Sequence, residues 1–158
     1  MSLLFLILLV DMASREVAPE AVALDLDRIV GHYEQPASRC PVSAENGVES
    51  CAQNATDRMV IQKLGDQYAR IVLHSHQAGG HQCHLDGVAN LTRMGLQYCL
   101  QYEPGTCVTL TQDASSIKLK VTLEGDFHIP FCGSRATLDG LTFRKRSRLP
   151  LQPCQRHP

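Results

Sequence analysis

Residues 117–123 read IKLKVTL, and this stretch decides the fold class. Apolar side chains take the odd-numbered positions, and two lysines and a threonine take the positions between them. Successive side chains of a β-strand point to opposite faces of the sheet, so an alternation of period two predicts a strand with one buried and one solvated side. A helix would need its apolar residues three and four positions apart, and the stretch lacks that spacing.

Similar short runs surround this stretch on both sides. They are separated by turn signals such as Gly65-Asp66, Pro104-Gly105 and Gly125-Asp126. About seven or eight short strands with such punctuation predict an all-β protein, a small antiparallel β-barrel or sandwich that disulfides stabilise. The strands are expected at residues 59–64, 67–75, 83–91, 96–102, 107–111, 117–123, 127–131 and 136–143.

Seven cysteines are scattered along the 158 residues without any C-x-x-C pair. That pattern speaks against a zinc ribbon or a thioredoxin-type redox site and favours structural disulfides made in an oxidising compartment. Since seven is odd, one cysteine is left over, and Cys154 beside Pro153 is the candidate. A local Cys40–Cys51 bridge is plausible, and the other pairings stay open. The six cysteines expected to pair are Cys40, Cys51, Cys83, Cys99, Cys107 and Cys132.

The N-terminal segment has features of an export signal. Residues 3–10 (LLFLILLV) are apolar over a length typical of a signal-peptide core and too short to span a bilayer, and Ala21-Val22-Ala23 has the form that signal peptidases favour. No Lys or Arg precedes the run, however, and residues 11–20 are unusually charged. We expect a leader at 1–23, one β domain at 24–148, a Pro-rich tail at 149–158, no transmembrane segment, and a periplasmic or secreted location.

The formal net charge of −1 speaks against nucleic acid as a partner, because phosphate binding needs a concentrated cationic surface. The charges are unevenly distributed, with acidic residues early and basic residues late. The basic run Arg144, Lys145 and Arg146 is a candidate surface for an acidic protein partner. A solvated tail is the alternative interpretation of the same run.

Four histidines and a cysteine lie close together around Gly79-Gly80 and raise the question of a metal site. A hairpin loop of two or four residues would put the ligand set on one face, whereas a loop of three or five residues would put Leu73 with Cys83 and Leu85 on an apolar face. Register follows the arrangement that buries one consistent apolar face, and the second does so. We therefore expect no metal site and no cofactor. The ligand set of the first arrangement is His74, His76, His81 and Cys83.

No catalytic motif is present. The chain has no G-x-S-x-G elbow, no H-E-x-x-H and no phosphate-binding loop. Cys83 and His84 are neighbours in the sequence, but adjacent residues of a strand point to opposite faces, which separates a thiol from its would-be base. The sequence therefore predicts a binding protein and not an enzyme.

The most distinctive stretch is FCGSRATLDGLTFRK, residues 131–145. A disulfide at Cys132 would anchor it, and Gly133 permits an unusual backbone at the next position. Ser134 and Arg135 would then project from a constrained turn, offering a hydroxyl donor and the planar donor fork that suits a carboxylate. An ordinary turn with Arg135 lying over the barrel is the alternative.

On these residues the chain resembles the membrane-bound or periplasmic C-type lysozyme inhibitors of Gram-negative bacteria. The segment Gly133-Ser134-Arg135-Ala136 is similar to the Ser/Gly loop with a nearby basic residue that this family inserts into the lysozyme cleft. The resemblance implies an exported, disulfide-supported barrel whose partner is a peptidoglycan hydrolase. Ser134 and Arg135 would then bind the catalytic carboxylates of the enzyme, while the basic run would steer the encounter.

Two other functions remain open. An immunity protein against a secreted bacterial toxin with an acidic cleft would use the same loop, and would suit the basic run better than a strongly basic lysozyme does. The triplet Gly31-His32-Tyr33 is also similar to the G-x-W of the lipocalins, which implies a carrier of a small apolar ligand inside a barrel.

Overall fold

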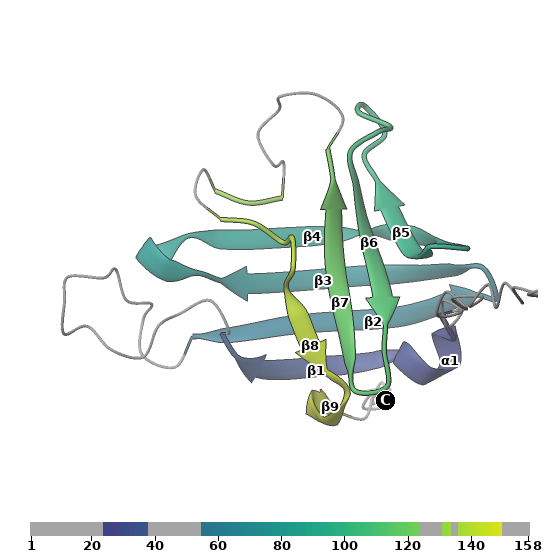
Figure 1. The fold of residues 1–158 in the computed structure, drawn as a ribbon, viewed down its shortest axis with the longest axis horizontal. Helices are drawn as coiled ribbons and strands as arrows, with labels where there is room; N and C mark the ends of the chain where they lie inside the picture. The colour runs from purple at the N-terminus through teal and green to yellow at the C-terminus, as the bar shows by residue number, and fades with distance from the viewer. Residues whose placement is uncertain (1–23, 38–54, 124–130, 134–135, 150–158) are drawn as a thin grey trace, which may run out of the picture.

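The computed structural model describes residues 24–37, 55–123, 131–133 and 136–149. Within these ranges nine antiparallel strands form one sheet in the order β8-β7-β6-β5-β4-β3-β2-β1-β9, which curls into a nearly closed barrel (Figure 1). The prediction of an all-β fold is confirmed. The elements are α1 (Leu26–Ile29), β1 (Gly31–Pro36), β2 (Thr56–Gly65), β3 (Tyr68–His76), η1 (Ala78–Gly80), β4 (Gln82–Thr92), β5 (Gly95–Cys99), β6 (Cys107–Gln112), β7 (Ser116–Thr122), β8 (Thr142–Arg144), η2 (Lys145–Ser147) and β9 (Arg148–Leu149).

The strands cross in two layers. Figure 1 shows β1, β2, β3 and β4 stacked side by side, with β6, β7 and β8 running in front of them at a steep angle. Apolar side chains from both layers meet between them and are almost completely buried, as strand alternation requires. The largest fully buried side chains of the core, including Ile29 of α1 and Leu138 ahead of β8, are Tyr33, Phe143, Ile29, Met59, Ile61, Ile71, Leu73, Leu85, Leu96, Leu110, Ile117 and Leu138.

The stretch 117–123 behaves as its alternation predicts. In β7, Ile117 and Leu119 are buried, whereas Lys118 and Lys120 are exposed. Leu119 lies opposite Leu110 of β6, so the inward side chains of the two strands share one face. The strand ends at Thr122, one residue earlier than the pattern suggests.

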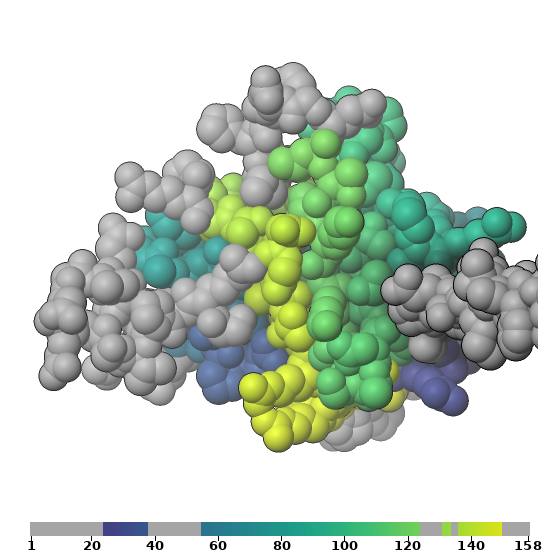
Figure 2. Space-filling view, viewed as in Figure 1, coloured from purple at the N-terminus to yellow at the C-terminus, as the bar shows by residue number. Residues whose placement is uncertain are grey.

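The C-terminal segment closes the barrel. β8 pairs with β7 and β9 pairs with β1, and only the three residues of η2 separate β8 from β9 in the chain. The side chain of Gln35 bridges the remaining gap, because its Nε2 donates to Thr142 O (2.8 Å) and its Oε1 accepts from Arg144 N (3.3 Å). Figure 2 shows this segment as a yellow strip between the green strands and the blue ones.

The first elements sit at one end of the barrel and are tied to its C-terminal strand. The hydroxyl of the buried Tyr33 donates to Ile29 O (2.7 Å), and burial raises the pKa of this phenol. Arg148 lies against Gly31, where a Cβ would come within 2.6 Å of its Nε, and its Nη1 donates to Arg28 O (3.2 Å). A larger residue at position 31, whose φ is +155°, would strain the backbone and displace the Arg148 side chain.

Most of the expected strands differ from the structure by one residue at an end, β2 begins three residues before the expected 59–64, and two others are markedly shorter than expected. Of the residues 136–143 expected as a strand, only 142 and 143 lie in β8, because Leu141 N bonds back to Leu138 O in a turn. Similarly, β5 ends at Cys99 and not at residue 102. The strand expected at 127–131 lies almost wholly outside the described residues.

Two disulfides hold the described part of the barrel, which confirms the prediction of structural disulfides. Cys83 of β4 is bonded to Cys132, and Cys99 of β5 is bonded to Cys107 of β6. The remaining cysteines, and the residues expected as leader and tail apart from Leu149 of β9, lie outside the described residues. Within the described ranges, no helix has the length and apolar character needed to cross a membrane.

Candidate functional site

The segment that carries the Ser134-Arg135 pair is held from its N-terminal side by β4. His84 N donates to Phe131 O (2.7 Å), and Gly133 N donates to Gln82 O (3.1 Å). Between these bonds the Cys83–Cys132 disulfide brings the two Cα atoms to 4.0 Å. The edge of β4 is available for this pairing because β5 pairs with β4 only at its far end, residues 90–92.

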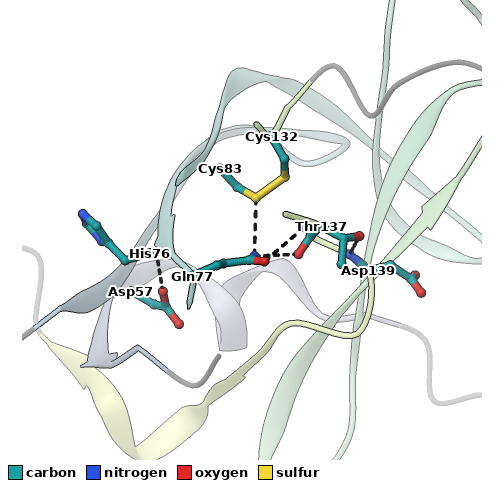
Figure 3. The surroundings of a disulfide bond; sticks show 7 residues. All are labelled: Asp57, His76, Gln77, Cys83, Cys132, Thr137 and Asp139. Atoms are coloured by element: carbon teal, nitrogen blue, oxygen red, sulfur yellow. Dashed lines mark hydrogen bonds between the residues drawn. A yellow bond between two sulfur atoms is a disulfide. The ribbon is translucent and has the colours of Figure 1, made fainter. Parts of the chain in front are cut away.

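The same segment is held from its C-terminal side by Gln77, which follows β3. Its Nε2 donates to Thr137 O (2.7 Å), and its Oε1 accepts from Thr137 N (3.1 Å). The amide thus makes the two hydrogen bonds that a neighbouring strand would make. Nε2 also lies 3.4 Å from the Sγ of Cys83, so one buried side chain contacts both the disulfide and the returning chain (Figure 3).

These two anchors fix the residues on either side of the pair. Ala136 N donates to Gly133 O at 3.0 Å, so the chain returns to its anchored base within three residues. Ser134 and Arg135 themselves lie outside the described residues. What the described residues show is a rigid base: a disulfide, three backbone hydrogen bonds and a reciprocal amide bridge within seven residues of chain.

The basic run Arg144-Lys145-Arg146 lies away from this anchored base, and its three side chains differ in exposure. The side chains of Arg144 and Arg146 are exposed, but Lys145 is half-buried and its Nζ donates to Asp113 O (2.6 Å) and to Gln112 Oε1 (3.2 Å). Lys145 therefore fastens η2 to the β6–β7 turn. In Figure 1 the chain leading into β8 starts near the top of the view, whereas β9 lies at the bottom, so the run is separated from the anchored base.

The histidine-rich hairpin adopts the second of the two arrangements considered. Leu73 lies opposite Leu85 and Ser75 opposite Cys83, and all four are buried. His74 lies opposite His84 on the outer face. Cys83 is held in its disulfide, so the ligand set imagined from sequence is not brought together.

On that outer face, the pKa of His74 is lowered, first by its partial burial and then by the neighbouring His84, His76 and Arg58. In the part of the chain that the structure covers, no three or more His, Cys, Asp or Glu side chains are placed to share a metal ion.

The sequence did not reveal the roles of Gln77, which holds the segment after Arg135, and of Gln35, which bridges β1 and β8 where the barrel closes. Gln35 and Gln77 act on backbone groups 107 and 60 residues away along the chain. A glutamine in a short mixed segment, whether strand or loop, carries no local signal for such a contact. The one available hint was that Gln77 directly follows a strand that ends at the hairpin.

We compared the chain with protein-family models, curated proteins and solved structures, and none of them matches it. Its class is therefore defined by the structure alone: a disulfide-bonded antiparallel β-barrel with a doubly anchored loop.

Proposed function

We propose that this protein is an exported binding protein that inhibits a cell-wall hydrolase by inserting Ser134 and Arg135 into its acidic cleft. The observation that carries the proposal is the double anchoring of the loop, by the Cys83–Cys132 disulfide on one side and by Gln77 on the other.

The physical advantage is preorganisation. Ordering a flexible side chain or loop on binding costs about 0.5–1.5 kcal/mol for each immobilised rotamer-rich side chain. A loop whose flanking residues are already held loses less of this free energy when it enters a cleft. Glycoside hydrolases present two carboxylates around the scissile bond, and the guanidinium of Arg135 and the hydroxyl of Ser134 are donors of the kind that carboxylates accept.

The packed interior also supports an external binding surface. The inward side chains of β1, β2, β3, β7 and β8 are nearly all fully buried against one another. A partner would therefore meet loops and outer faces. The exposed Arg144 and Arg146 lie away from the anchored base and would contribute to steering through long-range attraction, which raises the association rate more than the affinity.

The oxidising compartment is part of the proposal. Structural disulfides persist in secreted and periplasmic proteins and are rare in the cytosol. With Cys83–Cys132 and Cys99–Cys107 both formed, a periplasmic or secreted location is the one that suits the chain.

The test is an inhibition assay of the purified, oxidised protein against a panel of peptidoglycan hydrolases and muramidase toxins. Removing one partner of a buried charged pair costs about 2–5 kcal/mol, so Arg135→Ala is expected to weaken inhibition by thirtyfold or more. Arg93→Ala is the matched control, an exposed arginine at the far end of β4 and outside the basic run, and should change the inhibition constant less than threefold. Inhibition of no panel member, or equal effects of both variants, would refute the proposal. Selective inhibition of toxins would identify an immunity protein.

A lipocalin-like carrier is the second candidate. It is less well supported than the inhibitor, because over the described strands the inward side chains are nearly all buried against one another where a carried ligand would lie. Saturable binding of an apolar fluorescent probe by the purified protein would favour the carrier, and its absence would exclude this candidate.

A further inference from the structure

Two histidines form a cross-strand pair on the outer face of the β3–β4 hairpin. His74 lies directly opposite His84 in the register, and both side chains are exposed. Their Nδ1 atoms are 3.3 Å apart and their ring centroids 4.4 Å apart. Neither side chain takes part in the core, in a disulfide or in the loop anchors described above.

The separation of the two nitrogens is close to that of a chelating pair, although the rings are tilted by 46° with centroids 4.4 Å apart and would have to turn to direct both Nδ1 atoms to one ion. Zn²⁺ binds histidine nitrogen at about 2.0–2.1 Å in tetrahedral geometry, which puts two of its ligand nitrogens about 3.3 Å from each other. We propose that His74 and His84 form a bidentate site for a divalent ion of the zinc class, with water in the remaining positions. The pairing of β3 and β4 keeps the two residues opposite each other, and rotation of the exposed imidazoles about their side-chain bonds would complete the site.

The charged side chains nearest to the histidine pair form two arginine–carboxylate ion pairs, whose charges cancel. Arg58 lies opposite His74 on β2 and its Nη2 bonds Glu34 Oε1 at 3.2 Å. Arg70 binds both oxygens of Asp86, the next outward residue of β4, at 2.9 and 2.8 Å. Two arginines and two carboxylates thus face the site as ion pairs.

Asp86 is therefore engaged by Arg70 and is not counted as a ligand. The neighbouring His76 has its Nδ1 directed to Thr56 O at 3.0 Å and is not counted either. Two protein ligands agree with the finding that no larger cluster exists in the described ranges.

The protonation of the two imidazoles favours metal binding at neutral pH. For the two Nδ1 atoms to be hydrogen-bonded at 3.3 Å, one ring must carry its proton on Nδ1 and the other must carry its proton on Nε2. When the ion binds, both Nδ1 atoms must be bare, so the donor ring moves its proton through water to the exposed Nε2, and no net proton is released. A histidine must be neutral to bind the ion and ordinarily has a pKa of about 6.5, so protons compete little at pH 7.5 and more at pH 5.5.

The test is titration of the metal-free, oxidised protein with ZnCl₂ by isothermal calorimetry at pH 7.5 and 5.5. We expect a saturable site that His74→Ala/His84→Ala removes, that His84→Ala alone weakens at least tenfold, and that pH 5.5 weakens at least tenfold. His81→Ala, which removes an imidazole from the same hairpin, is the matched control and should leave the affinity within twofold. Because His74 and His84 are both exposed, far-UV circular dichroism should show that the double variant keeps the wild-type fold.

A second measurement separates this site from any other zinc ligands of the chain. Substoichiometric Cu²⁺ should selectively broaden the imidazole NMR signals of His74 and His84. The proposal is overturned if the double variant binds Zn²⁺ with the same affinity and stoichiometry as the unaltered protein, if His81→Ala has the same effect as His84→Ala, or if the broadening falls on other histidines.

Discussion

The Cys83–Cys132 disulfide should contribute more to stability than the Cys99–Cys107 disulfide. In the chain-entropy description, a cross-link stabilises by restricting the unfolded chain, and the effect grows with the logarithm of the loop that it closes. The two bonds span sequence separations of 49 and 8 residues. At 25 °C the relation gives about 4 kcal/mol for the longer loop and about 2.5 kcal/mol for the shorter one.

The experiment compares two double variants, Cys83→Ala/Cys132→Ala and Cys99→Ala/Cys107→Ala. Urea unfolding followed by far-UV circular dichroism gives the free energy of unfolding of each, and peptide mapping without reductant checks that the other disulfides are unchanged. Native domains are stable by about 5–15 kcal/mol, so the first variant is expected to lose a large share of that and to unfold at much lower urea.

The ranking, and not the absolute values, tests the reasoning. The first variant keeps the backbone bonds to β4 and the Gln77 bridge, so its loss should come mainly from the unfolded state. If the Cys99→Ala/Cys107→Ala variant loses as much free energy as the first, loop closure is not the source of the stabilisation.

Two further predictions concern a close approach and a titrating turn. Gly95 has φ +134°, and a Cβ there would lie 2.2 Å from Leu110 O. Gly95→Ala should therefore lower the free energy of unfolding, measured in urea, by about 3 kcal/mol. A decrease below about 1 kcal/mol would contradict that contact. The pKa of Asp113 is lowered by hydrogen bonds from Ser115 and Ser116 and by Lys118. A carboxyl whose pKa is lowered in the folded state stabilises the protein fully above its unfolded pKa of about 3.9, and this stabilisation is lost progressively as the pH falls below that value. The free energy of unfolding of the wild type should therefore fall more steeply than that of Asp113→Asn between pH 5 and pH 2. Parallel curves would refute the assignment.

The fold class was readable because strand alternation is a local property. The lysines and apolar residues of 117–123 report which side of β7 is buried, whatever the strand pairs with. The hairpin register was also predictable, since only one parity puts Leu73 beside Leu85. The strand β1 was not assigned in advance, because Gly31–Pro36 is short and mixed and becomes a strand only by pairing with β2 and β9.

The candidate site was half predictable. Residues 131–136 stood out by composition, and the sequence predicted that a disulfide at Cys132 would anchor them. Its partner, Cys83, could not be chosen from seven cysteines, because pairing depends on which strand edge the returning chain reaches. The basic run looked continuous in sequence, yet Lys145 is diverted to the β6–β7 turn.

By itself, then, the sequence determined the alternation of buried and exposed positions, the antiparallel class and the presence of disulfides. These depend on residue type and near-neighbour spacing. The hairpin register also put His74 and His84 on one face, and the structure added the distance between them. The tertiary structure alone decided the pairing of Cys83 with Cys132 and the bridges made by Gln35 and Gln77. Such contacts join residues that are brought together only when the barrel closes, and a side chain that bonds a distant backbone group leaves no periodic trace in the chain that carries it.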